Sequence, residues 1–263
     1  MTEPLVTYAL EGEVALVGLN RDDVRNAINA QLLDELRDQV LRACEEARAG
    51  VIFSHGEQHF SAGLDLASVI ERSKMPPPRL RRRSNWHTTF DLISRDSIPW
   101  VSALKGATVG GGLELAASTH IRVADESTFF ALPEAQRGIF VGGAGSVNIQ
   151  RLMGYARMAD MMLTGRVMSA QEALDANVVQ YLVPANESLE KAKQLAVRIA
   201  ENPPMVNWGV TAYLSRTGDM SHDDGMFAES LLGANVRSGQ TTPRIEQFLE
   251  GEAAPIEAPT DAD

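Results

Sequence analysis

Short apolar runs alternate along this chain with helix-like segments, and this alternation limits the possible fold more than any other feature. The apolar runs are rich in β-branched residues and lie at residues 14–19, 51–54, 101–104, 121–124 and 178–183. Apolar residues recur at three- and four-residue steps over residues 28–49, which predicts an amphipathic helix that ends before Gly50. A second helix is predicted over residues 189–200. Strands that alternate with helices predict an α/β fold.

Composition excludes several classes of protein. The 263 residues include 24 Lys and Arg against 35 Asp and Glu, and a net charge of −11 argues against general binding to nucleic acid or anionic membranes. With one cysteine, Cys44, the chain has no intrachain disulfide and no cysteine-built zinc site. No run approaches about 18 consecutive apolar residues, and the start lacks a signal-peptide pattern. We therefore expect a cytoplasmic protein without a membrane span.

Two segments look irregular from the sequence. Residues 68–95 contain Pro76, Pro77 and Pro78 and then a basic cluster, Arg79 to Arg83. One interpretation of this segment is a solvated loop, and the other is a lid whose arginines meet an anionic ligand. Residues 251–263 are acidic and nearly free of large apolar side chains, which predicts a disordered tail.

Several common site motifs are missing. His55 and His59 are four residues apart, but Gly56 interrupts the helix that a zinc site of this spacing needs. The chain has no P-loop and no G-x-G-x-x-G after a predicted strand. Ser146 lacks the G-x-S-x-G surroundings of a hydrolase nucleophile. We therefore predict no metal site and no nucleotide cofactor.

Two glycine-bearing segments follow predicted strands, at residues 60–66 and 106–117. Three successive glycines, residues 110–112, stand between a strand and a helix, where the backbone can approach a ligand without Cβ atoms in the way. The first amides of a helix are unpaired donors at the positive end of its dipole. The segment therefore predicts an anion or oxyanion site, although triple glycine also serves tight packing of a helix on a sheet.

Two glutamates lie beside these glycines. Glu114 falls about one turn into the predicted helix, among apolar neighbours. Glu134 follows Pro133 and precedes a second glycine cluster at residues 138–145. Taken singly, each is ordinarily a solvent-facing side chain. Taken together, they are typical of paired carboxylates that carry out acid–base chemistry.

The order and spacing of these motifs resemble the crotonase superfamily, which has the enoyl-CoA hydratase/isomerase fold. Residues 20–29 resemble the family's N-R-P-x-x-x-N-A-L-N, with Asp22 in place of proline. Residues 60–66 and 110–116 resemble F-x-A-G-x-D-L and G-G-G-x-E-L-A. Residues 133–142 resemble P-E-x-x-x-G-x-x-P-G, with Val141 in place of the second proline. Further matches follow at residues 151–154, 163–165 and 169–179, and the resemblance covers nearly the whole chain.

The resemblance implies a crotonase-like spiral of ββα units over residues 1–199 and a C-terminal helical trimerisation region over residues 200–250. It also implies a homotrimer, or a homohexamer made of two trimers. The ligand would be an acyl-CoA thioester. Coenzyme A would then be part of the substrate, and no separate cofactor is expected.

The resemblance also assigns roles to single residues. The backbone N–H groups of Leu64 and Gly111 would form the oxyanion hole. Glu114 and Glu134 match the two glutamates of true hydratases, where one carboxylate deprotonates water and the other, by resemblance Glu134, supplies the α-proton. The implied substrate contacts are Val24, Arg25, Ala62, Leu66 and Gly142. The family's basic residue after A-G-x-D is replaced by neutral residues here, and our hypothesis is that Arg25 or the Arg79 to Arg83 cluster compensates as a charge-assisted donor to the phosphates.

The sequence therefore predicts an enoyl-CoA hydratase that adds water syn across the 2,3-double bond of a 2-enoyl-CoA. Within the same fold, the alternatives are an enoyl-CoA isomerase and a hydratase-lyase that acts on an aryl-propenoyl-CoA. In the latter, Trp86, Phe90 and Tyr213 would accept the aromatic ring. The alternative from a different class is a non-catalytic acyl-CoA binding subunit.

Overall fold

The computed structural model describes residues 3–75, 84–95, 98–236 and 241–251. It divides the chain into two units, Met1–Ala212 and Tyr213–Asp263, and both sheets belong to the first. The predicted division at residues 199 and 200 is not tested by this partition and stays a prediction. Among the described residues, no helix combines the length and apolar character that crossing a bilayer requires.

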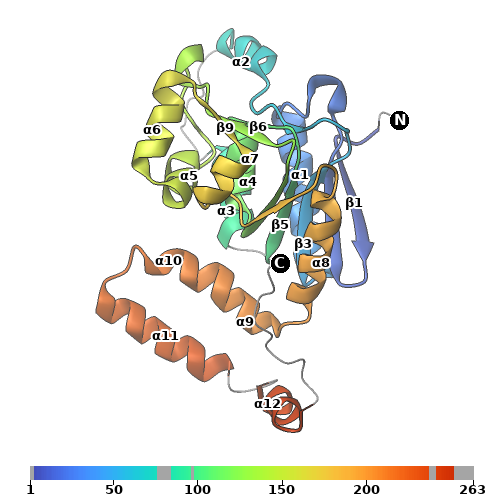
Figure 1. The fold of residues 1–263 in the computed structure, drawn as a ribbon, viewed down its shortest axis with the longest axis vertical. Coiled ribbons are helices and arrows are strands. Elements are labelled where there is room, and N and C mark those ends of the chain that lie inside the picture. Colours follow the sequence, from blue (N-terminus) through green and yellow to red (C-terminus); the bar gives the residue numbers. More distant parts are fainter. Residues whose placement is uncertain (1–2, 76–83, 96–97, 237–240, 252–263) are drawn as a thin grey trace. The chain divides into compact units, whose positions relative to one another are not determined.

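The larger sheet of the first unit has the strand order β1-β2-β3-β5-β7-β10, and its strands β1, β3 and β5 are labelled in Figure 1. Only β1 and β2 pair antiparallel, as a hairpin that turns at Gly12, and the other neighbours are parallel. Every residue of β2 is buried, which is typical of a sheet covered on both faces. The strands are β1 (Val6–Glu11), β2 (Val14–Leu19), β3 (Ala49–Ser54), β5 (Trp100–Leu104), β7 (Ile121–Asp125) and β10 (Tyr181–Val183).

The smaller sheet has the order β4-β6-β8-β9, and its strands are β4 (His59–Ser61), β6 (Ala107–Val109), β8 (Phe129–Ala131) and β9 (Val167–Ser169). The strand pairs β3/β4, β5/β6 and β7/β8 each place one strand in each sheet, and a helical segment follows each pair. This repeat confirms the predicted spiral of ββα units. The helices that follow are α2 (Leu66–Ser73) and α3 (Asn85–Arg95), then α4 (Gly111–Ser118), then α5 (Gly145–Met153) and α6 (Tyr155–Thr164).

The predicted helix over residues 28–49 is present as α1 (Ala30–Glu46), but its end differs. The Asn29 side chain caps its start by accepting a hydrogen bond from the Leu32 amide at 2.8 Å. Gly50 does not end the helix, because it lies within β3. A Cβ on Gly50 would stand 2.3 Å from the Trp100 ring, so this glycine lets the indole pack across the sheet.

The prediction that residues 68–95 are irregular is wrong for the part that the structure describes. Asp65 Oδ1 accepts hydrogen bonds from the Ala67 and Ser68 amides and so caps α2. Helix α3 has a buried face that includes Phe90 and Ile93, and burial of this face stabilises it. The Arg79 to Arg83 cluster and residues 252–263 lie outside the described residues.

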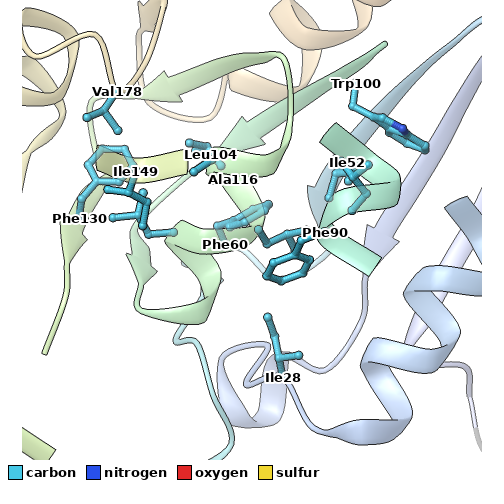
Figure 2. Close-up of a cluster of buried hydrophobic side chains, with 14 of the residues drawn as sticks. Ile28, Ile52, Phe60, Phe90, Trp100, Leu104, Ala116, Phe130, Ile149 and Val178 are labelled. Carbon is cyan, nitrogen blue, oxygen red and sulfur yellow. The ribbon is translucent and has the colours of Figure 1, made fainter. Parts of the chain in front are cut away.

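Two clusters of buried side chains cover the two faces of the larger sheet. One contains Ile28, Phe60, Phe90, Trp100 and their neighbours, and Figure 2 shows part of it. The other lies beneath α8 (Ser188–Ala200), the helix beside β3 in Figure 1. It includes Ala192, Leu195 and Ala196 of that helix. Helix α8 matches the predicted helix over residues 189–200. The predicted strand over residues 178–183 is shorter, since β10 begins at Tyr181.

Short elements complete the first unit, and helices make up the described second unit. The first unit also holds α7 (Ala170–Asp175), α9 (Pro204–Trp208) and single turns at Asp22–Val24 and Ala135–Arg137. A π-helical stretch, Gly209–Leu214, leads into α10 (Ser215–Thr217), α11 (His222–Val236) and α12 (Thr241–Leu249). The predicted C-terminal helical region is therefore present.

Candidate active site

The backbone around Leu64 is fixed by hydrogen bonds to a distant segment. The Ile28 amide donates to the Gly63 carbonyl at 2.7 Å, and the Asp65 amide donates to the Ile28 carbonyl at 3.0 Å. The Ala62 amide, which precedes Gly63, donates to the Arg25 carbonyl oxygen at 2.8 Å. The amide of Leu64 itself lies between these bonds and donates to no described residue. Its N–H group is therefore held in place and left available.

A charged pair strengthens this link. Arg21 Nη1 donates to Asp65 Oδ2 at 2.7 Å and to the Ala27 carbonyl at 2.8 Å. The hydrogen bond from Arg21 holds the pKa of Asp65 below its usual value, against the opposing effect of burial. Because Asp65 also caps α2, one carboxylate joins the start of that helix to the segment that fixes Leu64.

The second amide belongs to Gly111, the first residue of α4. As an N-terminal amide it has no partner within its helix, and it donates to no other described residue. A Cβ built on Gly111 would stand 3.4 Å from the Leu64 nitrogen, so the two amides are close neighbours. Gly63 allows this approach: its φ is +86°, and a Cβ there would stand 2.5 Å from the Val109 carbonyl oxygen.

Glu114 lies one turn into α4 and is only 3% exposed. Its Oε1 accepts hydrogen bonds from the amides of Gly143 at 2.7 Å and Gly145 at 2.8 Å. Its Oε2 lies 3.4 Å from the Gly142 amide. Burial raises the pKa of Glu114, and these amides at the start of α5 act in the opposite direction by stabilising the carboxylate.

Glu134 follows β8 and is 6% exposed, but it has a different environment. Its Oε2 is buried without a hydrogen-bond partner among the described residues. Its Oε1 lies 2.6 Å from the position of a Cβ on Gly110, whose φ of +54° also favours glycine. Burial raises the pKa of Glu134, and the negative charge of Glu114 raises it further.

These groups meet in one cavity of about 410 Å³. Five of the residues that the sequence singles out line it: Leu64, Gly111, Glu114, Glu134 and Gly142. The other predicted contacts, Val24, Arg25, Ala62 and Leu66, do not line it, and their role in binding stays a prediction. Trp86, which the sequence suggested only as an acceptor for an aromatic ring, also lines it. The remaining lining residues were not named from the sequence: Val69, Ser73, Ser84, Ile139 and Phe140.

The three aromatic residues proposed to accept an aromatic ring lie in different environments. Trp86 lines the cavity, and Phe90 is completely buried behind it. Tyr213 belongs to the second unit, where its hydroxyl donates to the Gly225 carbonyl at 2.8 Å. Because residues four apart lie on the same face of a helix, the spacing of Trp86 and Phe90 could have predicted a helix that places Trp86 next to the core.

Metal ligation finds no support in the described part of the chain. Across residues 3–75, 84–95, 98–236 and 241–251, no group of three or more His, Cys, Asp and Glu side chains is arranged to hold an ion. The cavity itself presents the amides of Leu64 and Gly111, which donate to no described residue, and two buried carboxyl groups.

Comparison with known proteins gives a consistent result. A model of the enoyl-CoA hydratase/isomerase family matches residues 9–251. The Arabidopsis thaliana relative named "Probable enoyl-CoA hydratase 2, mitochondrial" is 34% identical, over 90% of this chain and 77% of its own length. The short-chain-enoyl-CoA hydratase of Clostridium acetobutylicum is 31% identical, over 74% and 75%. A crystal structure from Rhodopseudomonas palustris is 41% identical, covers 96% of this chain and 97% of its own, and has a TM-score of 0.84.

Proposed function

Because the chain belongs to the enoyl-CoA hydratase/isomerase family, we propose that it adds water syn across the 2,3-double bond of a 2-enoyl-CoA thioester. The observation that carries this proposal is the contrast between the two glutamates. Glu114 accepts hydrogen bonds from backbone amides, whereas Glu134 is buried with an unpartnered oxygen beside that carboxylate. One buried carboxyl group suited to being a base and another suited to being an acid are what hydration needs.

The amides of Leu64 and Gly111 would bind the thioester oxygen. Attack at C3 pushes the double-bond electrons toward the carbonyl, so the oxygen gains negative charge as an enolate forms. Donors already in place stabilise this charge without reorganisation. By analogy with other oxyanion holes, one such donor lowers the barrier by about 3 kcal/mol.

The protons would then be divided between the two carboxyl groups. Glu114, as the carboxylate, takes a proton from water while the water oxygen bonds to C3. Glu134, as the neutral acid, gives its proton to C2 as the enolate collapses. The product is a 3-hydroxyacyl-CoA. Glu114 then releases the proton that it took from water, and Glu134 takes up a proton, which restores the enzyme. Burial and the nearby charge of Glu114 raise the pKa of Glu134, which is the direction that a general acid requires.

Hydration is redox neutral, so we propose that it proceeds without an added cofactor, coenzyme A being part of the substrate. Val24, Arg25, Ala62 and Leu66 remain the proposed contacts of the coenzyme A moiety. Arg25 is exposed, so its guanidinium is available to a phosphate. We also propose a homotrimer or homohexamer located in the cytoplasm, and light scattering after size-exclusion chromatography tests the assembly.

The proposed reaction is tested by following the loss of the conjugated thioester absorbance of but-2-enoyl-CoA. In water labelled with oxygen-18, the product should carry the label on C3. Glu114→Ala and Glu134→Ala should each abolish turnover. Binding of the thioester without turnover in the unsubstituted protein would instead support the non-catalytic subunit.

Product analysis separates the two alternative reactions of the same fold. Incubation with a 3-enoyl-CoA would yield a 2-enoyl-CoA without label if the protein were an isomerase. Incubation with an aryl-propenoyl-CoA would release an aldehyde if hydration were followed by cleavage. Neither product is expected to dominate, because two carboxyl groups and a water suffice for addition alone.

A further inference from the structure

Trp86 lies against the two backbone segments that define the candidate site. A Cβ on Gly111 would stand 2.7 Å from Trp86 Cζ3 and 2.8 Å from Cη2, the far edge of the six-membered ring. A Cβ on Gly143 would stand 3.1 Å from Trp86 Cε3 on the same ring. The benzo ring of the indole therefore contacts both glycines while it also lines the cavity.

The indole is held in this position from behind. The rings of Trp86 and Phe90 meet edge to face, with centroids 5.4 Å apart and planes at 75°. Phe90 is completely buried, and its ring also packs on Gly143, 2.6 Å from the position of a Cβ there. Moving the indole away from the cavity would open a gap in close-packed core, which is energetically costly.

The two glycines mark the two ends of the reacting system. The amide of Gly111 is one of the proposed thioester donors, and the amide of Gly143 holds the proposed base, Glu114. C2 and C3 of the substrate must lie between the carbonyl carbon and the water that Glu114 activates. The ring of Trp86 forms the cavity wall between Gly111 and Gly143, so it borders C2 and C3 rather than the far end of the acyl chain.

From this placement we propose that Trp86 is a specificity-determining residue, and that the substrate class is 2-enoyl-CoA thioesters with no branch at C2 or C3. The inference rests on the proposed function. A methyl group on either carbon would collide with a ring that cannot retreat. Substituents beyond C3 meet the other apolar lining residues instead, which are Val69, Ile139 and Phe140.

The test compares three thioesters: but-2-enoyl-CoA, 2-methylbut-2-enoyl-CoA and 3-methylbut-2-enoyl-CoA. The unsubstituted protein should prefer the first in kcat/KM by roughly 10- to 200-fold, the range that one methyl group commands in a shaped apolar pocket. Trp86→Leu should shrink this preference at least about tenfold, and Trp86→Phe, which keeps a ring against Phe90, should shrink it less. Circular dichroism and thermal melting confirm that each variant is folded.

Val69→Ala is the matched control, because it enlarges the same cavity on α2 without changing the wall at Gly111 and Gly143. It should leave the preference for the unbranched thioester unchanged. The proposal is overturned if the unsubstituted protein hydrates all three thioesters at similar efficiency, or if the Trp86 variants lower all three by the same factor, as a purely structural residue would.

Failure of the proposed reaction gives a different result. If none of the three thioesters is hydrated, the proposed function is wrong, and binding of the saturated analogues decides the role of Trp86. Isothermal titration with butanoyl-CoA, 2-methylbutanoyl-CoA and 3-methylbutanoyl-CoA should then show that Trp86→Leu improves the affinity for the branched compounds relative to the straight one. Equal changes for all three would refute the specificity role.

Discussion

The two ends of the candidate site use different kinds of chemical group. At one end, which we propose binds the thioester and call the thioester end, the groups are main-chain amides of Leu64 and Gly111, whose positions depend on backbone paths and on Gly63. At the other end, which we propose carries out the proton transfers and call the acid–base end, the groups are the side chains of Glu114 and Glu134. Activity should therefore be sensitive to side-chain substitution at the acid–base end and to backbone distortion at the thioester end.

The largest expected effect is at the acid–base end. Glu114→Gln or Glu134→Gln keeps the shape of the side chain and removes its proton transfer, so each should lower kcat by about 10²- to 10⁴-fold. Steady-state loss of the thioester absorbance measures the change. The double variant should lose less than the product of the two factors, because the carboxyl groups act as a unit. A loss below about tenfold in both single variants would remove the proton-transfer roles.

The pH dependence sharpens the assignment within that end. Glu114 must be ionised to act as base, so kcat/KM should fall as pH drops through its raised pKa. Glu134 must be protonated to act as acid, so kcat/KM should fall as pH rises through its raised pKa. Since the carboxyl groups interact, the two limbs report the pair. Loss of the alkaline limb in Glu114→Gln, in place of the acid limb, would reverse the two roles.

A substitution that moves the backbone should disrupt the amide donors at the thioester end. In Gly63→Ala, the new Cβ would meet the Val109 carbonyl oxygen at 2.5 Å, at a φ of +86° that side chains rarely adopt. Displacing one amide donor should lower kcat by about 10²- to 10³-fold. The assay is the same, with circular dichroism as the folding control. Near-normal kcat in a folded Gly63→Ala protein would contradict the proposed donors.

A more moderate effect should come from the charged pair that supports the thioester end. Asp65→Asn removes the ionised partner of Arg21 and should lower the free energy of unfolding by about 1–3 kcal/mol at pH 7. Urea denaturation measures it. The pKa of Asp65 is lowered in the folded state, so its contribution is present above the unfolded value of about 3.9 and is lost as pH falls below it.

The difference in stability between the two proteins should therefore shrink on acidification below about pH 4. Asp38→Asn, a change at a largely exposed carboxylate 3.5 Å from Arg37, is the matched control and should alter stability by less than about 1 kcal/mol. An equal loss in both variants would show that the Arg21–Asp65 pair has no special role.

The smallest effect is expected from a side-chain change at the same end. Leu64→Ala keeps the main-chain donor, so kcat should stay within about threefold, and any change should be in KM through the shape of the cavity. Comparing Leu64→Ala with Gly63→Ala, one residue apart, tests the main-chain character of this end directly. A large loss of kcat in Leu64→Ala would mean that the side chain, rather than the amide, is required.

The local patterns in the sequence were informative because short-range geometry governs them. Gly110 to Glu114 form the start of a helix, so the spacing alone placed a carboxyl group one turn from a free amide. The apolar periodicity over residues 28–49 identified α1 for the same reason. Gly50 was misinterpreted as a helix end, because the ring of Trp100 that requires it is fifty residues away in the chain.

Residues 68–95 show where sequence patterns mislead. Prolines and arginines in the middle of this segment predicted irregular structure, yet α2 and α3 flank them. Capping by Asp65 and burial of Phe90 against the core stabilise these helices, and neither contact follows from composition. The position of Trp86 in the cavity wall is a consequence of that packing.

The alternation of predicted strands and helices determined the α/β class and drew attention to the glycines and glutamates, because periodicity and helix geometry act over a few residues. The spiral of ββα units was implied by the resemblance to the crotonase superfamily. The resemblance implied that the amides of Leu64 and Gly111 are neighbours, and the tertiary structure gives their proximity. Only the tertiary structure decided that Glu114 accepts hydrogen bonds from the 142–145 segment and that Trp86 contacts both Gly111 and Gly143. These relations join segments 20 to 60 residues apart. Such contacts arise when close packing of the whole core selects one arrangement of the spiral's turns, which no local pattern encodes.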